Sequence, residues 1–447
     1  MKLFHDLACR PSSSVNALLA FALCACAAPA ATSEALTNGD TAARSTMTAS
    51  APAAEPSPAA ASQAASAPST TPAADSTTVA QAGSPANDAA PAAAQPAEPP
   101  TPPAAPAPEA AAPPALPKPT PAPQQPYAGR DEARAFAQAL EASRGIDAAW
   151  TLAQLDRAVY VPQVARLMMP PPAGTAKDWA EYRARFVEPK RIAAGAAFWR
   201  ANEAWLDRAN ARWGVPPWLV VGIVGVETFY GRVTGNFRVI DALASLSFDF
   251  PTGRRDRSPF FTSQLGEFLH WCRREGIDPQ SVLGSYAGAI GLPQFMPGSI
   301  NRWAVDFDED GHVDLLRNHA DVVGSVAHYM AAHGWQRDMP TTYDVLVPVD
   351  ATQRATLLAP DIVPTFSAAQ MLSHGAVLRG RRAREHEGPL ALVELQNGDK
   401  APSYVAGTEN FYVVTRYNWS SYYAMAVIDL GRAVEAEVRR SSRNPAP

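Results

Sequence analysis

The chain has 447 residues and a formal net charge of −5, a length that allows two or three domains. Residues 27–126 hold seven acidic side chains against two basic ones, so this stretch accounts for the whole net charge and the remainder is close to neutral. Because nucleic-acid binding needs a basic face, this balance excludes nucleic acid as a partner.

The first 26 residues are typical of an export signal. Two basic residues precede an apolar run over 15–24, which is too short to span a membrane comfortably. The run leads into Leu-Cys-Ala-Cys at 23–26, which resembles the lipobox of bacterial lipoproteins. Cleavage before Cys26 would then leave its thiol to carry a lipid. The alternative is ordinary cleavage in the small-residue stretch 27–31.

Residues 27–126 are almost wholly Ala, Pro, Ser, Thr and Gln, and the next aromatic residue is Tyr127. Such a composition cannot bury enough apolar surface to offset its backbone entropy. We therefore expect a disordered Ala/Pro-rich tether, followed by a folded region over 127–447. Cys272 is the one cysteine in that region, which excludes an intrachain disulfide and a cysteine metal site there.

The folded region reads as mainly helical. Helix formers and apolar spacing predict helices at 131–140, 149–169, 177–187, 190–213, 216–230, 260–275 and 422–439, with a turn-rich passage at 247–260. Short β-prone runs occupy 343–349, 376–378 and 390–395. The pattern predicts an α+β fold, mainly α, with a small β-rich insertion near 341–408.

The segment with most chemical information ends at Glu227. Pro216 and Pro217 suit the first turn of a helix, and every residue over 218–226 is apolar or Gly, which predicts a buried helix. A carboxyl group at the end of such a helix is partly desolvated, so its pKa rises and it stays protonated near neutrality. That is the property of a general acid. The alternative is a structural carboxylate that satisfies a backbone amide or an arginine.

Two further segments suit a carbohydrate ligand. Residues 284–299 combine three glycines with Ser285 and Gln294, which can hydrogen-bond sugar hydroxyls or an acetamido group. A tight packing turn between helices explains the pattern equally well. Residues 410–423 place aromatic rings beside an amide, a common way to hold a sugar ring, but also a common pattern of core packing.

An acidic stretch matches the first nine positions of an EF-hand calcium loop, with candidate ligands Asp306, Asp308, Asp310, His312 and Asp314. The twelfth position, which should offer a bidentate carboxylate, is Arg317. Calcium is therefore possible but doubtful, and a solvated acidic turn is the alternative.

Together and in this order, these segments resemble the membrane-bound lytic murein transglycosylase B family. The resemblance runs from about 131 to 432 and includes Gly-Val-Glu-Thr around Glu227, Gly-Ser-Tyr-Ala-Gly at 284–288 and Thr-Arg-Tyr-Asn at 415–418. It implies a lysozyme-like catalytic core with an α domain and a small β domain. Glu227 falls on the family's catalytic acid/base. The saccharide-contacting positions fall on Arg254, Arg255, Ser285, Gln294, Tyr329, Tyr417, Asn418 and Tyr423.

The resemblance also implies an activity and a location. The enzyme would cleave peptidoglycan between N-acetylmuramic acid and N-acetylglucosamine without water, form 1,6-anhydromuramyl ends, and need no cofactor. It would lie in the periplasm, tied to the outer membrane through a lipid on Cys26. A hydrolytic muramidase on the same fold and an inactive glycan-binding scaffold are the alternatives.

Overall fold

The structure, a computed structural model, describes residues 126–169, 177–253 and 255–443. Cys26, Arg254 and the part of the predicted tether up to residue 125 lie outside the described residues. The described part is mostly helical, as predicted.

A short 3-10 turn, η1 (Tyr127–Gly129), precedes the helices. These are α2 (Asp131–Arg144), α3 (Ala148–Asp156), α4 (Pro162–Met168), α5 (Trp179–Ala184), α6 (Pro189–Ala201), α7 (Glu203–Trp213), α8 (Pro217–Thr228), α9 (Val239–Phe248), α10 (Ser258–Glu275), α11 (Pro297–Trp303), α12 (His319–Ala332), α13 (Ala351–Leu358), α14 (Ala368–Ser373), α15 (Arg381–Arg384), α16 (Glu409–Tyr417) and α17 (Ser421–Arg443).

The helix predicted over 149–169 is wrong in its middle, because α3 and α4 are separate. The backbone amide of Val159 donates to the Asp241 carboxylate at 3.0 Å, and that of Val161 donates to the Ser245 hydroxyl at 2.9 Å. Both acceptors belong to α9. These side chains satisfy amides that would otherwise need helical partners, so the connection can stay extended.

The helix predicted over 190–213 is likewise two helices, α6 and α7. They meet at Asn202, whose side-chain amide donates to the Phe198 carbonyl at 2.8 Å. The backbone amide of Asn202 donates to the same carbonyl at 3.1 Å, so the side chain and the backbone of Asn202 together close the last turn of α6. An asparagine inside a helical pattern therefore marks a boundary here.

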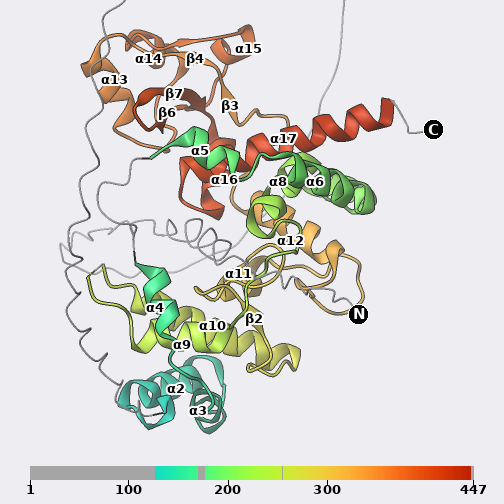
Figure 1. Cartoon of the computed structure of the whole chain (residues 1–447), viewed down its shortest axis with the longest axis vertical. Coiled ribbons are helices and arrows are strands. Elements are labelled where there is room, and N and C mark those ends of the chain that lie inside the picture. Colours follow the sequence, from blue (N-terminus) through green and yellow to red (C-terminus); the bar gives the residue numbers. More distant parts are fainter. Residues whose placement is uncertain (1–125, 170–176, 254, 444–447) are drawn as a thin grey trace, which may run out of the picture. The chain divides into compact units, whose positions relative to one another are not determined.

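The strands are short and antiparallel: β1 (Phe237–Arg238), β2 (Leu283–Gly284), β3 (Thr342–Tyr343), β4 (Val345–Leu346), β5 (Val377–Leu378), β6 (Ala391–Asn397) and β7 (Lys400–Gly407). They form the sheets β1-β2, β3-β7-β6 and β4-β5. Strand β7 was not predicted. Three helices, α13 to α15, also lie within the stretch predicted as β-rich, and Figure 1 shows them around β3 to β7.

The C-terminal helix α17 packs along α8 and α6 (Figure 1). Every residue of α8 from Trp218 to Thr228 is buried, as its composition predicts. The two helices approach closely at Gly222 and Gly431. A methyl group on Gly222 would overlap the Val427 carbonyl, and one on Gly431 would overlap the Trp218 carbonyl. Backbone therefore contacts backbone where α8 and α17 cross.

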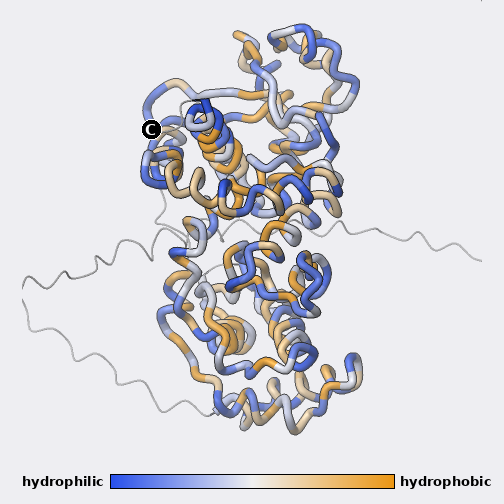
Figure 2. The backbone as a smooth tube through the Cα atoms, turned by 90° about the vertical axis from the view of Figure 1, so that its right-hand side faces the viewer, coloured by the Kyte–Doolittle hydropathy of each residue, from blue (hydrophilic) through white to orange (hydrophobic). Residues whose placement is uncertain are grey.

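Hydrophobic and hydrophilic residues alternate along much of the backbone (Figure 2), as expected for helices that bury one face, whereas α8 is apolar and buried all round. Cys272 is a buried free thiol in α10. Among the described helices, none combines the length and the apolar character that crossing a bilayer requires.

Candidate active site

Glu227 lies in the last turn of α8 and is 7% exposed. Burial raises the pKa of its carboxyl group to about 7, because the charged form loses the solvation that water provides. A hydrogen bond from Tyr423 acts in the opposite direction and lowers the pKa. The group can therefore hold a proton near neutrality and also release it.

Tyr423, near the start of α17, supplies that hydrogen bond. Its hydroxyl donates to Oε1 of Glu227 at 2.6 Å. Its ring stacks on that of Tyr417, with centroids 6.3 Å apart and planes 11° apart. Burial and the charge of Glu227 raise the pKa of both phenols well above the usual value, so both remain hydroxyl groups and can donate.

Tyr417 and Tyr329 extend this aromatic wall. The Tyr417 hydroxyl donates to the Pro293 carbonyl at 2.5 Å, which fixes the end of α16 against the loop that follows β2. The Tyr329 ring lies 4.9 Å from that of Tyr417, and its hydroxyl donates to the Arg416 carbonyl at 2.7 Å. The structure thus joins three of the predicted tyrosines to Glu227 in one continuous series of contacts.

The end of α8 is tied to the loop after β2 by a second bond. The Thr228 hydroxyl donates to the Leu292 carbonyl at 2.9 Å, and it accepts a bond from the Gly231 amide at 3.0 Å. The predicted residue Gln294 lies two positions further along this loop. Glu227 and Gln294 are therefore held on segments that are directly bonded to each other.

Two predicted amides carry buried oxygens that lack a hydrogen-bond partner. Gln294 is 5% exposed and donates through Nε2 to the Thr234 and Gly291 carbonyls, while its Oε1 has no partner among the described residues. Asn418, directly after Tyr417, is 3% exposed, and its Oδ1 likewise has no partner there. Buried acceptors of this kind are costly unless a ligand or water satisfies them.

The structure gives Ser285 an internal role. Its hydroxyl, 2% exposed, accepts hydrogen bonds from the backbone amides of Ala287 and Ala289 at 3.3 and 3.0 Å. The glycines around it pack against protein: a methyl group on Gly288 would lie 2.5 Å from the Leu243 side chain. This favours the packing-turn interpretation of the segment, although Gln294 at its end lies beside the site.

Arg255 is exposed in the loop before α10. Within the described residues it makes neither a hydrogen bond nor an ion pair with the residues around Glu227. Its predicted companion Arg254 lies outside the described residues. The structure therefore does not join the arginine pair to the site.

Sequence reasoning missed Tyr182 of α5. Its ring lies 5.7 Å from that of Tyr422, and burial together with the nearby charge of Glu227 raises the pKa of its phenol. Trp179 stacks on it at 6.3 Å, and Phe186 lies 5.2 Å away. The available signal was this spacing of aromatic residues within the predicted helix at 177–187.

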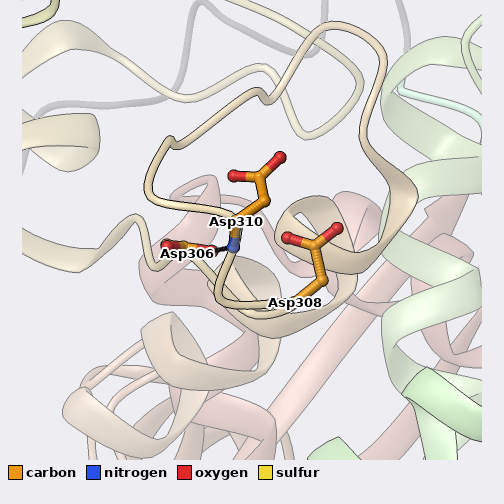
Figure 3. Close-up of side chains that lie close together, drawn as sticks. All are labelled: Asp306, Asp308 and Asp310. Atoms are coloured by element: carbon orange, nitrogen blue, oxygen red, sulfur yellow. Dashed lines mark hydrogen bonds between the residues drawn. The ribbon is translucent and has the colours of Figure 1, made fainter.

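Three of the predicted metal ligands converge in the acidic loop (Figure 3). Asp306, Asp308 and Asp310 have carboxylate oxygens within 4.8 Å of one another, the one such group of possible metal ligands found in the described residues. Asp306 also accepts the backbone amides of Asp310 and Gly311 at 3.1 and 2.8 Å. His312 and Asp314 are not part of the group.

The loop is held without a metal by Asp321 of α12, which is fully buried. Its carboxylate accepts the backbone amides of Phe307 at 2.8 Å and Asp314 at 2.7 Å, so it joins the two ends of the loop. Arg317, at the position of the bidentate ligand, is exposed and offers no oxygen from its side chain. The donor set therefore does not fit a high-affinity calcium site.

Comparison with known proteins identifies the family. A model described as a transglycosylase SLT domain matches residues 128–432, which include every described residue of the site. The chain belongs to this transglycosylase family. The family predicted from the sequence is confirmed.

Three relatives illustrate the similarity. Membrane-bound lytic murein transglycosylase B of Escherichia coli (strain K12) is 37% identical over 316 residues, 69% of this chain and 84% of that protein. The Escherichia coli lytic transglycosylase Slt35 in complex with calcium has a TM-score of 0.61 and 35% identity, with 70% and 95% of the two chains covered. SltB3 from Pseudomonas aeruginosa in complex with NAG-anhNAM-pentapeptide has a TM-score of 0.58 and 28% identity, with 68% and 78% covered.

Proposed function

We propose that this lytic murein transglycosylase cleaves the β-1,4 bond between N-acetylmuramic acid and N-acetylglucosamine in peptidoglycan, with Glu227 as its general acid and base. The observation that carries the proposal is a buried carboxyl group whose pKa is about 7 and which accepts a hydrogen bond from Tyr423. The NAG-anhNAM-pentapeptide bound to SltB3 is the type of product that such a reaction forms.

Glu227 acts twice in this mechanism. The protonated carboxyl group first donates its proton to the departing glycosidic oxygen as the bond to the muramyl anomeric carbon breaks. The muramyl C6 hydroxyl then attacks that carbon, and the Glu227 carboxylate takes the hydroxyl proton. The new C1–O6 bond closes the 1,6-anhydro ring, Glu227 regains its proton, and water is not consumed.

One carboxyl group suffices because the substrate's acetamido group can stabilise the cationic anomeric centre. The two acidic residues that follow Glu227 in the chain support this view, since both are engaged elsewhere. Asp241 is bonded to Arg238 at 2.6 Å, and Asp249 to Arg130 at 2.8 Å. Neither is available as a nucleophile opposite Glu227.

The aromatic wall and the two amides are the proposed saccharide contacts. Tyr417 and Tyr329 would offer apolar ring surface, while Asn418 and Gln294 would bond sugar hydroxyl or acetamido groups through their unpartnered oxygens. Ser285, Arg254 and Arg255 remain part of the proposal only through the family resemblance. The binding site is therefore built mainly from the tyrosines and amides near Glu227.

We also propose that the enzyme works in the periplasm, anchored to the outer membrane by a lipid on Cys26. The E. coli relative is named as membrane-bound, which supports a membrane location. A lipid at Cys26 would leave about 100 residues before the first helix, enough to span roughly 50–100 Å as a flexible chain. Radiolabelled palmitate incorporation into the wild-type chain but not into Cys26→Ser tests the anchor.

Digestion of purified sacculi tests the reaction itself. We expect mass spectrometry to find muropeptides with ends one water lighter than hydrolysis products, and Glu227→Gln to bind glycan without cleaving it. General acid–base catalysis contributes a factor of about 10² or more, so retention of about a tenth of wild-type turnover would exclude Glu227. Hydrated ends would instead identify a hydrolytic muramidase, and absence of turnover in the wild type would identify a glycan-binding scaffold.

A further inference from the structure

His333 lies directly after α12 and packs against two aromatic rings, Tyr329 and Trp303, which also contact each other at 4.9 Å. Its imidazole stacks on Tyr329, with centroids 4.0 Å apart and planes 23° apart, and its other ring neighbour is Trp303 of α11 at 4.7 Å. Its Nδ1 lies 2.7 Å from the Tyr329 carbonyl oxygen. Because a carbonyl can only accept, Nδ1 carries the proton of this bond. His333 thus contacts Tyr329 through both its ring face and its ring edge.

The histidine side chain is not needed to end the helix. The backbone amide of His333 already donates to the Tyr329 carbonyl at 3.1 Å, and the Trp335 amide donates to the Met330 carbonyl at 3.0 Å. These two bonds satisfy the last carbonyls of α12, as in other helix ends. The imidazole therefore adds a contact that capping alone does not require.

Tyr329 carries this contact into the active site. Its hydroxyl donates to the carbonyl of Arg416, the residue before Tyr417, and its ring packs against that of Tyr417 at 4.9 Å. Tyr417 stacks on Tyr423, which bonds Glu227. The imidazole and Glu227 are thus the two ends of one row of rings and hydroxyl groups.

We propose that His333 is a positioning residue for the transglycosylase reaction. It fixes Tyr329, and through Tyr329 it holds Tyr417 and Asn418 at the glycan and keeps water from Glu227. The proposal rests on the function proposed above. Burial lowers the pKa of the imidazole, the hydrogen bond to the Tyr329 carbonyl raises it, and the positive charge of Arg416 lowers it. The net shift is downward, which favours the neutral ring with its proton on Nδ1.

Two substitutions separate the ring from its hydrogen bond. His333→Asn retains an N–H donor for the Tyr329 carbonyl but removes the flat ring, whereas His333→Phe retains the ring and removes the donor. Since an aromatic pair is worth up to about tenfold in binding, we expect His333→Asn to raise KM for glycan strands by about tenfold with a small change in kcat. His333→Phe should stay within about threefold of the wild type. His374→Asn, after α14, is the matched control and should change neither constant.

The pH profile supplies a readout that a purely structural role would not change. If the wall loosens in His333→Asn, water reaches Glu227 and lowers its pKa, so the alkaline limb of kcat/KM moves to lower pH by about half a unit or more. His333→Phe should leave the limb in place. Both variants lack the imidazole, so the difference between them does not reflect titration of His333.

The outcomes are distinct. If His333→Asn folds and both its KM and its alkaline limb are unchanged, the inference is overturned. It is also overturned if the variant has a lower melting temperature and no other change. If His333→Asn does not fold, Tyr329→Phe tests the same link by removing only the hydroxyl on the Arg416 carbonyl, and an unchanged KM there overturns it. If the wild type and His374→Asn release no anhydro ends, the proposed function fails. If both are active and His333→Asn matches them, only the inference about His333 fails.

Discussion

The hydroxyl of Tyr423 and the carboxylate of Glu227 lie 2.6 Å apart although 196 positions separate the two residues in the chain. The bond favours the ionised carboxylate, whereas burial favours the protonated one. The proposed mechanism, in which Glu227 first gives and then takes a proton, needs both influences, because either alone would favour one state.

Tyr423→Phe removes the hydrogen bond that favours the ionised carboxylate of Glu227. A hydrogen bond to a charged group is worth about 1.5–3 kcal/mol, so the pKa of Glu227 should rise by about one unit or more. The alkaline limb of kcat/KM should move to higher pH by the same amount, measured on soluble glycan strands. Tyr422→Phe is the matched control, since the Tyr422 hydroxyl donates to the Gln396 carbonyl at 3.0 Å instead. An unmoved limb in Tyr423→Phe would show that the bond does not tune Glu227.

The raised pKa of Glu227 also predicts how stability depends on pH. In the unfolded chain the carboxyl has its ordinary pKa near 4.3, whereas in the folded protein the value is about 7. Between these values the folded state binds more protons at this site, so the contribution of Glu227 to stability is fully present below the unfolded pKa and is lost as pH rises through about 7. The cost of ionising this buried group is about 3 kcal/mol.

Glu227→Gln removes this dependence. We expect the variant to unfold at a higher denaturant concentration than the wild type at pH 8, and to differ little from it at pH 4. Equilibrium unfolding followed by circular dichroism at both values is the measurement. A stability difference that is the same at both pH values would contradict the assigned pKa.

The crossing of α8 and α17 leaves no room for a side chain at two positions. Gly222→Ala and Gly431→Ala would each place a methyl group against a backbone carbonyl, which cannot rotate away. We expect each to cost about 3 kcal/mol in the free energy of unfolding and to lower turnover by displacing Tyr423 from Glu227. Gly129→Ala is the control, because an added methyl group there meets nothing within 4 Å.

Calcium should not be required for activity. Arg317 stands at the position of the bidentate ligand, so a chelator should leave both turnover and the melting temperature of the wild type unchanged. Arg317→Glu should create a calcium-dependent rise in melting temperature at micromolar calcium, because it completes the donor set around Asp306, Asp308 and Asp310. A chelator-induced fall of several degrees in the wild type would contradict this prediction.

The sequence around Glu227 alone was enough to predict the helix that carries this residue. The two prolines and the apolar run that follows them define α8, and a carboxyl group at its end could be recognised without knowledge of the fold. The boundaries between α3 and α4 could not, because Asp241 and Ser245 of α9 determine them from more than 80 positions away.

In the sheet β3-β7-β6, likewise, one strand could be predicted from its own sequence and another could not. Strand β6 begins with an apolar run at 391–393, but β7 carries Lys400 and Pro402 and gains its strand character from pairing with β6. The two-residue turn Gly398-Asp399 between them was the available hairpin signal. Tyr182 was missed for a related reason: its proximity to Glu227 arises from the packing of α5 near α17, which no local pattern records.

The contact of α17 with α8 has a consequence for when the enzyme becomes able to act. The ribosome makes Glu227 about halfway through synthesis, but Tyr423 and the helix that buries the carboxyl group come from the end of the chain. Until α17 docks, Glu227 lacks the Tyr423 hydrogen bond and the part of its burial that α17 supplies, so we expect its pKa to lie nearer the ordinary value and the proposed acid to be weaker at neutral pH. We therefore expect a nascent or truncated chain that ends before Ser421 to leave peptidoglycan intact.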